Sequence, residues 1–234
     1  MLKTFKILTQ IILSLLILTC ADTSPVSENK KIITDRQKQQ INIENRSELD
    51  NILLERIRET SFILNNGLKL STADWTPRGG IWDFSDSIYY GQGTQINNKA
   101  YYNKTDFGDF IFEVKMTKLT EDGSFGLLFR YNEHTDNGYI LEIYPHGGFV
   151  FGTYYLGVRE VLINEPIKKF KRAVNAWNKV KVLAKGNAFS VFINDYLITS
   201  LKNNRYSTGR IGFYIGGGPR QQARFRVMQI KEFK

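Results

Sequence analysis

Hydrophobic side chains recur at every second position in several short segments of this chain, and this period of two limits the available folds more than any other feature. The alternating residues are Phe110, Phe112, Val114 and Met116, then Phe125, Leu127 and Phe129, then Tyr139, Leu141 and Ile143, and finally Phe189, Val191 and Ile193. Such segments form β-strands that bury one face. Turn-forming residues such as Asp136-Asn137-Gly138 separate them. The pattern predicts an all-β antiparallel β-sandwich of the jelly-roll type.

One hairpin can be given a register from its turn residues alone. Asn194 and Asp195 both tolerate positive φ, as a two-residue turn between antiparallel strands requires. This turn would place Ile193 opposite Tyr196 and Val191 opposite Ile198.

The cysteine and histidine content excludes a disulfide-stabilised scaffold and the common protein metal centres built from these residues. The 234 residues contain one cysteine, Cys20, so a disulfide scaffold or cysteine zinc site is excluded. His134 and His146 are the only histidines, which excludes a multi-histidine metal centre.

Residues 1–20 have the charge and hydropathy of a signal peptide, with Lys3 and Lys6 before an apolar run over 7–18. As a helix this run would reach about 18 Å, short of the roughly 30 Å core of a bilayer. The run ends at Cys20 and resembles a bacterial lipobox. We therefore expect lipidation of Cys20 and an exported lipoprotein anchored to a membrane of the bacterial cell envelope; a plain secretory signal is the alternative.

The remaining chain divides into three parts. Residues 21–46 are polar and lack aromatic residues, which predicts a flexible tether. Ser47 is a candidate N-cap, and Leu49, Ile52, Leu53 and Ile57 have helical spacing, which predicts a short helix over 47–60. Its mixed charges favour packing on the following domain over membrane or partner binding. Residues 61–234 form the jelly-roll module.

The order of several motifs carries a family resemblance over about residues 61–233. These motifs are Asp74-Trp75, Gly80-Ile81-Trp82, Phe107-Gly108-Asp109-Phe110, Gly126-Leu127-Leu128-Phe129-Arg130-Tyr131, Trp177-Asn178-Lys179-Val180, Phe192-Ile193-Asn194-Asp195 and Gly209-Arg210-Ile211-Gly212. In this order they resemble the concanavalin A-like lectin/glucanase jelly roll, and within it the laminin-G-like and 3-keto-disaccharide hydrolase-like modules of bacterial surface proteins. The resemblance implies that a glycan binds on the outward, concave sheet.

No residue is predicted to be catalytic in glycoside hydrolysis, because the Glu-x-Asp-x-x-Glu run of jelly-roll glucanases is absent. A binding site is predicted instead. If Phe129 and Leu141 are cross-strand neighbours and residues 133–137 form the loop, then Arg130 and Glu142 project from the outward face and meet diagonally. Tyr144 and Tyr154 would join them. Donors, acceptors and aromatic rings suit sugar recognition; a structural ion pair is the equally weighted alternative.

The 3-keto-disaccharide hydrolase resemblance leaves an enzyme open. Such chemistry would need an acid/base group and a metal, for which His146 and Glu142 are the local candidates. Two ligands do not make a catalytic metal site, so no cofactor is predicted and the metal is unknown. Calcium between loops is possible without being indicated.

The chain is basic, with a formal charge of +9. The basic residues cluster at Lys168, Lys169, Lys171, Arg172, Lys179, Lys181, Arg220, Arg224 and Arg226. A solvated basic edge is the default interpretation of these clusters. Because exported proteins rarely meet nucleic acid, an acidic polysaccharide or anionic headgroups are the partners expected if the clusters bind a ligand. The sequence thus predicts a membrane-anchored lipoprotein with a non-catalytic carbohydrate-binding module. A glycoside or 3-keto-disaccharide hydrolase or lyase, and an adhesive or structural protein-binding lipoprotein, are the alternatives.

Overall fold

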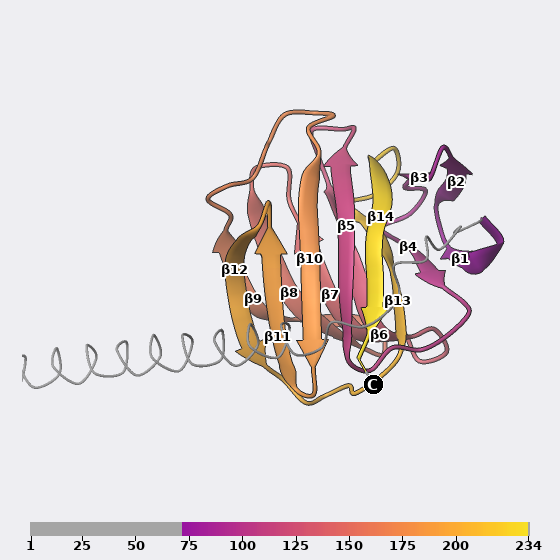
Figure 1. The fold of residues 1–234 in the computed structure, drawn as a ribbon. Coiled ribbons are helices and arrows are strands. Elements are labelled where there is room, and N and C mark those ends of the chain that lie inside the picture. Colours follow the sequence, from indigo (N-terminus) through magenta and orange to yellow (C-terminus); the bar gives the residue numbers. More distant parts are fainter. Residues whose placement is uncertain (1–71, 234) are drawn as a thin grey trace, which may run out of the picture. The chain divides into compact units, whose positions relative to one another are not determined.

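The computed structural model describes residues 72–233. The predicted signal peptide over 1–20, tether over 21–46, helix over 47–60 and first residues of the module lie outside the described residues. Within them, two seven-stranded antiparallel sheets pack face to face, with one short 3-10 helix, Thr72–Asp74 (Figure 1). The predicted all-β antiparallel sandwich is confirmed.

The two sheets interleave strands from the whole described chain. The β6 sheet has the order β1-β4-β13-β6-β7-β8-β9, and the β5 sheet has the order β12-β11-β10-β5-β14-β3-β2. The β6 sheet comprises β1 (Trp75–Arg78), β4 (Asn97–Tyr102), β6 (Ser124–Asn132), β7 (Asn137–Ile143), β8 (Gly148–Tyr155), β9 (Val158–Pro166) and β13 (Arg210–Gly216). The β5 sheet comprises β2 (Ile81–Ser85), β3 (Ile88–Gln92), β5 (Phe110–Lys118), β10 (Asn178–Lys185), β11 (Ala188–Ile193), β12 (Tyr196–Lys202) and β14 (Gln222–Glu232).

In residues 72–233, no helix is both long enough and apolar enough to cross a membrane.

The alternating residues of the sequence form the core between the sheets. All thirteen of the residues used to predict the strands are buried in one hydrophobic cluster. An aromatic stack crosses this cluster: the Trp75 and Phe213 rings lie 4.3 Å apart and nearly parallel, and Phe213 and Phe225 lie 4.6 Å apart. Because Phe213 comes from the β6 sheet and Phe225 from the β5 sheet, this stack joins the two layers.

The hairpin between β11 and β12 has the predicted turn. Asn194 and Asp195 both have positive φ, and Ile193 pairs with Tyr196 as expected. The second predicted pair is wrong, because Val191 lies opposite Thr199 instead of Ile198. A β-bulge between Val191 and Phe192 shifts the register by one residue.

The predicted register of the β6–β7 hairpin is also wrong. Phe129 pairs with Tyr139, and Leu141 pairs with Leu127. The register shifts between Phe129 and Asn132, and Arg130 in this irregular stretch has φ of 47°. The bulge reverses the direction of the Arg130 side chain relative to a regular strand.

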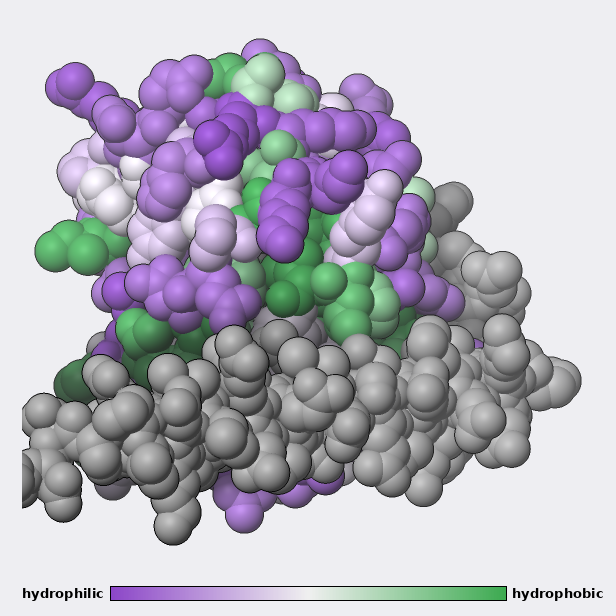
Figure 2. All heavy atoms as spheres, turned by 90° about the vertical axis from the view of Figure 1, so that its left-hand side faces the viewer, coloured by the Kyte–Doolittle hydropathy of each residue, from purple (hydrophilic) through white to green (hydrophobic). Residues whose placement is uncertain are grey.

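Strands β9 and β12 form the edges of the two sheets on the same side of the sandwich (Figure 1). Figure 2 shows this side, where hydrophilic residues cover most of the described surface between hydrophobic patches. Strand β9 contains Arg159, Glu160 and Glu165 and ends at Pro166. Charged residues and proline on an edge strand hinder pairing with another sheet.

Candidate functional site

A row of cross-strand neighbours on the outer face of the β6 sheet forms the centre of the candidate site. Lys99 of β4 lies opposite Tyr214 of β13, Tyr214 lies opposite Gly126 of β6, and Gly126 lies opposite Glu142 of β7. Their sequence neighbours Ala100, Phe213 and Leu141 are buried, and the last two belong to the core between the sheets. The row therefore faces away from the core.

Glu142 is the acceptor in a hydrogen-bonded group that we call the Glu142 triad, with Arg159 and Tyr144. Ser124 donates its hydroxyl to Glu142 Oε1 at 2.6 Å, and Arg159 forms an ion pair with Glu142 Oε2. Arg159 also donates to Tyr144 Oη at 3.1 Å. The Glu142 side chain is 4% exposed whereas that of Arg159 is 35% exposed, so the arginine is the accessible member of the ion pair.

The rim of the triad is aromatic. The Tyr144 and His146 rings lie 5.5 Å apart and are nearly parallel, and His146 is exposed in the turn after β7. Burial raises the pKa of the Tyr144 hydroxyl, and the hydrogen bond from Arg159 opposes this shift without cancelling it. Tyr144 therefore stays a neutral hydroxyl at physiological pH, with a ring and an oxygen at the edge of the site.

A second polar group, the Lys99 cluster, consists of Lys99, Asp136, Tyr131 and Arg78. Lys99 Nζ forms an ion pair with Asp136 Oδ1, to which Tyr131 Oη donates at 2.6 Å. Arg78 Nη1 donates to Tyr131 Oη at 3.1 Å. Burial lowers the pKa of Lys99 despite the opposing charge of Asp136. Burial acts to raise the pKa of Asp136, but the hydrogen bonds from Lys99 and Tyr131 outweigh it and hold that pKa below its usual value.

Tyr154 connects the two groups. Lys99 Nζ lies 4.4 Å from the centre of the Tyr154 ring, and Tyr154 pairs in register with Arg159 of β9. Burial raises the pKa of Tyr154, and the charge of Glu142 contributes in the same direction. The outer face of the β6 sheet thus has a buried aromatic and ionic floor with a partly exposed rim.

Two local features of the chain position these side chains. Leu156 and Gly157 both have positive φ and form a two-residue turn, which sets Tyr154 opposite Arg159. Gly126 lets β6 approach β7 closely beside Glu142, because a Cβ at this position would lie 1.9 Å from the carbonyl oxygen of Leu141.

The structure brings together four of the five predicted binding residues. Glu142, Tyr144, His146 and Tyr154 share the outer face or rim described above. The expected meeting of Arg130 with Glu142 is wrong. Arg130 is buried elsewhere, donates to the carbonyl oxygens of Gly108 and Tyr206, and lies with its guanidinium 4.9 Å from the centre of the Phe189 ring. The bulge in β6 and the positive φ of Arg130 account for this placement.

Arg159 is the basic partner of Glu142 that the sequence argument missed. The turn Leu156-Gly157 would have revealed it, because a two-residue turn predicts that Tyr154 and Arg159 are cross-strand neighbours. Lys99, Asp136, Tyr131 and Tyr214 were missed as well. Their meeting depends on β13 inserting between β4 and β6, a long-range pairing that no local pattern encodes.

Across residues 72–233, no three side chains of the types His, Cys, Asp and Glu group together as metal ligands do. The candidate pair Glu142 and His146 has no third such residue in that range to form a group.

Comparisons with known proteins found a curated relative and solved structures of similar fold. A levanase of Bacillus subtilis is 24% identical over 146 residues, which are 60% of this chain and only 20% of the levanase. The carbohydrate-binding module CBM66 from Bacillus subtilis superposes with a TM-score of 0.59 at 21% identity, covering 68% of this chain and 96% of that module.

A second solved structure, a prokaryotic β-1,3-1,4-glucanase (lichenase) derived from a mouse hindgut metagenome, has a TM-score of 0.53 at 10% identity, covering 70% of this chain and 94% of the glucanase. These likenesses confirm the concanavalin A-like jelly-roll fold. Residues 62–231 match the family described as the 3-keto-alpha-glucoside-1,2-lyase-like domain. The match extends over most of the chain, which therefore belongs to that family.

Proposed function

We propose that the Glu142 triad and its aromatic rim bind a glycan without transforming it. The observation that carries this proposal is the partly exposed Arg159, which holds both the Glu142 carboxylate and the Tyr144 hydroxyl. The accessible guanidinium supplies directed donors for sugar hydroxyls, and the Tyr144 hydroxyl can also hydrogen-bond to them. The Tyr144 and His146 rings at the rim supply apolar faces for pyranose or furanose C–H groups.

Two relatives support glycan recognition. One is described as a carbohydrate-binding module and superposes over 96% of its length, and the other is a levanase. The present chain spans only a fifth of that levanase, so the activity of the whole levanase is not transferred by this likeness. The proposal therefore concerns glycan binding alone and not the activity of the levanase.

The test is glycan-array screening of the protein followed by calorimetry with the best ligand. Arg159→Ala and Tyr144→Ala should each weaken binding by about tenfold or more, because each removes a charge-assisted bond or a stacking surface. Arg205→Ala is the matched control. Arg205 pairs with Glu160 outside the triad and has a side chain 38% exposed, close to that of Arg159. Absence of any sugar binding at millimolar concentration, or equal losses in Arg205→Ala, would falsify the proposal.

An elimination enzyme is the second candidate, favoured by the lyase description of the family. Elimination across C1 and C2 of a 3-keto-glucoside needs a base for the C2 proton and an acid for the departing C1 oxygen. Glu142, His146 and the Lys99 cluster are the acid/base candidates on this face and its rim. The same protein incubated with 3-keto-disaccharides and divalent metals would then release sugar, and Glu142→Gln would stop the release. Inertness of the wild type across such a panel dismisses this candidate.

We further propose that Cys20 carries the lipid that anchors the protein to a membrane of the cell envelope. The proposal rests on the apolar run over 7–18 that ends just before this cysteine. Labelled fatty acid should enter the wild-type protein in cells, and Cys20→Ser should abolish the label. Equal labelling of the two proteins would refute the anchor.

A further inference from the structure

The outer face of the β5 sheet, opposite the Glu142 triad, carries three cations side by side. Lys115 of β5 lies directly opposite Lys179 of β10 on one side and Arg226 of β14 on the other. Like charges at directly opposed positions destabilise a sheet. Among the residues that the structure describes, Lys179 is the only one of the three with an ion pair, which it forms with Asp195.

The neighbouring row shows that this sheet can compensate its charges. Two residues along the same strands, Lys181 lies opposite Glu113, and Glu113 lies opposite Gln229. That row alternates a cation, an anion and a neutral amide. The row through Lys115 contains no anion of its own, and only Asp195, which pairs with Lys179, offsets one of its three charges. It therefore leaves a net positive potential directed outward.

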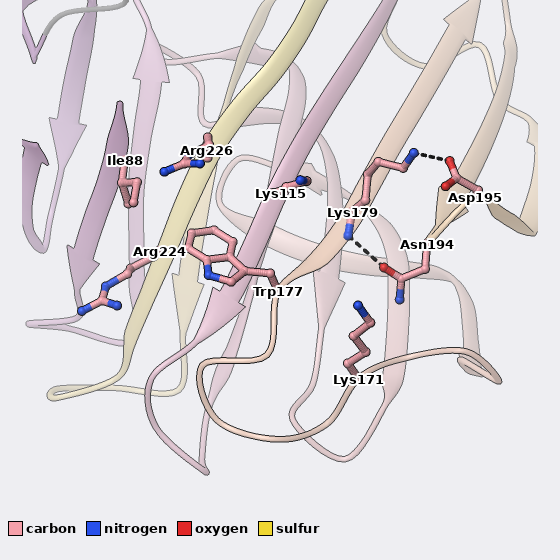
Figure 3. Close-up of a pocket in the computed structure, with 9 residues that line it drawn as sticks. All are labelled: Ile88, Lys115, Lys171, Trp177, Lys179, Asn194, Asp195, Arg224 and Arg226. Atoms are coloured by element: carbon pink, nitrogen blue, oxygen red, sulfur yellow. Dashed lines mark hydrogen bonds and ion pairs between the residues drawn. The ribbon is translucent and has the colours of Figure 1, made fainter. Parts of the chain in front are cut away.

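The row through Lys115 lies in a cavity of about 590 Å³, which we call the cationic groove (Figure 3). Its lining residues are Ile88, Lys115, Lys171, Trp177, Lys179, Asn194, Asp195, Arg224 and Arg226. The lining thus has five cationic side chains and one carboxylate. The volume falls within the range of about 300–1,000 Å³ that is usual for ligand sites. The basic segment and the late arginines of the sequence meet here, although they are distant in the chain.

One wall of the groove is fixed by the side-chain amides of Asn178 and Asn194. Asn178 is buried and binds both backbone groups of Lys171, accepting from its N–H at 2.9 Å and donating to its carbonyl oxygen at 3.0 Å. Asn194 donates to Asn178 Oδ1 at 2.9 Å and to the carbonyl oxygen of Lys169 at 2.8 Å. The loop that carries Lys171 and Trp177 is therefore held against the β11–β12 turn. A loop held in this way preorganises the groove.

Trp177 supplies an aromatic surface among the cations. In Figure 3 its indole lies between Lys115, Arg224 and Lys171. The side chain is half-buried, and no ring contact or cation–π contact within the described part of the chain involves it. A half-exposed ring in a recess that is engaged with no other ring or cation is suited to stacking against a ligand.

We propose that the cationic groove binds an acidic polysaccharide, with Lys115, Arg226 and Arg224 contacting carboxylates or sulfates and Trp177 stacking on a sugar ring. The combination of a recess, a central aromatic ring and a row of cations favours a chain of charged sugars over the flat surface of an anionic membrane. This proposal does not depend on the Glu142 triad, because the two sites lie on opposite sheets.

The experiment is calorimetry of the full-length protein with oligogalacturonate at low ionic strength, with dextran as the neutral polymer and phosphatidylglycerol vesicles as the lipid probe. Lys115→Ala and Trp177→Ala should each weaken oligogalacturonate binding by about tenfold. Lys181→Ala is the matched control: it removes one lysine from the same sheet but from the compensated row, and should change binding by less than about twofold. Arg159→Ala should leave this binding unchanged.

A second measurement separates binding from folding. Lys115→Ala relieves repulsion between neighbouring cations, so its melting temperature without ligand should be equal to or above that of the wild type. Weaker binding together with undiminished stability supports the groove. Three outcomes overturn the proposal: equal losses in Lys115→Ala and Lys181→Ala, dextran binding as tight as oligogalacturonate binding, or vesicle binding that exceeds oligogalacturonate binding and is indifferent to Trp177→Ala.

Discussion

At the scale of single residues, the buried pair Lys99 and Asp136 determines how the outer face of the β6 sheet responds to pH. Lys99 is 3% exposed, and its only ion pair within residues 72–233 is to Asp136. A buried ammonium without its carboxylate would be costly, since its desolvation would no longer be offset by attraction. The lowered pKa of Asp136 means that the folded protein holds this carboxylate ionised more strongly than the unfolded chain does.

Asp136→Asn should therefore destabilise the protein by about 3 kcal/mol at neutral pH, because it leaves Lys99 buried and unpaired. The unfolded carboxyl takes up its proton near pH 4, before the folded one. Stability from this group is thus present above about pH 4 and is lost as pH falls through the folded pKa. Urea unfolding between acidic and neutral pH should show this loss in the wild type and a shallower one in Asp136→Asn.

Lys99→Met provides the control for that experiment. It removes the buried charge while keeping a long apolar side chain, and Asp136 keeps its hydrogen bond from Tyr131. Lys99→Met should lower the free energy of unfolding by clearly less than Asp136→Asn does. If the two variants lose equal stability, the desolvated ammonium is not the cause of the effect.

At the scale of elements, the turns fix the registers that build the site. The β8–β9 turn contains Leu156 with φ of 50°, a conformation that Leu disfavours and Asn tolerates. Leu156 is 65% exposed, so its replacement forfeits little buried area. The strained Leu156 lies in the turn that sets Tyr154 opposite Arg159.

Leu156→Asn should stabilise the protein by about 1 kcal/mol, since Asn adopts positive φ at lower cost. Gly157→Ala in the same turn should act in the opposite direction, because Gly157 has φ of 77°. Thermal or urea unfolding measures both. A destabilised Leu156→Asn variant would show that the Leu156 side chain contributes contacts that outweigh its backbone strain.

The same elements show what could be predicted from the sequence. Alternation predicted the buried faces of four strands correctly, because burial on one face is a property of each strand alone. It failed at Arg130, since a bulge shifts the register by one residue without changing the composition. The pairing of Tyr154 with Arg159 was accessible from the two-residue β8–β9 turn, whereas the insertion of β13 between β4 and β6 was not. Four of the five candidate residues thus lie together on the outer face or rim of the β6 sheet, whereas the Lys99 cluster beneath them was not predicted.

At the scale of the whole described module, two different surfaces face away from one aromatic core. The β6 sheet presents an ion-paired and hydrogen-bonded face, and the β5 sheet presents the cationic groove. The core between them is closed by contacts such as Phe213 with Phe225, which belong to opposite layers. The chain alternates between the sheets along its length, so each surface is assembled from distant segments.

Because the two sheets pack face to face, their outer surfaces point in opposite directions. Sheets packed in this way lie about 10 Å apart. Ligands seated on both outer surfaces would approach from opposite directions and could not compete for space. One copy with both proposed sites occupied would then cross-link two polysaccharide chains, with the thickness of its aromatic interior as the spacer.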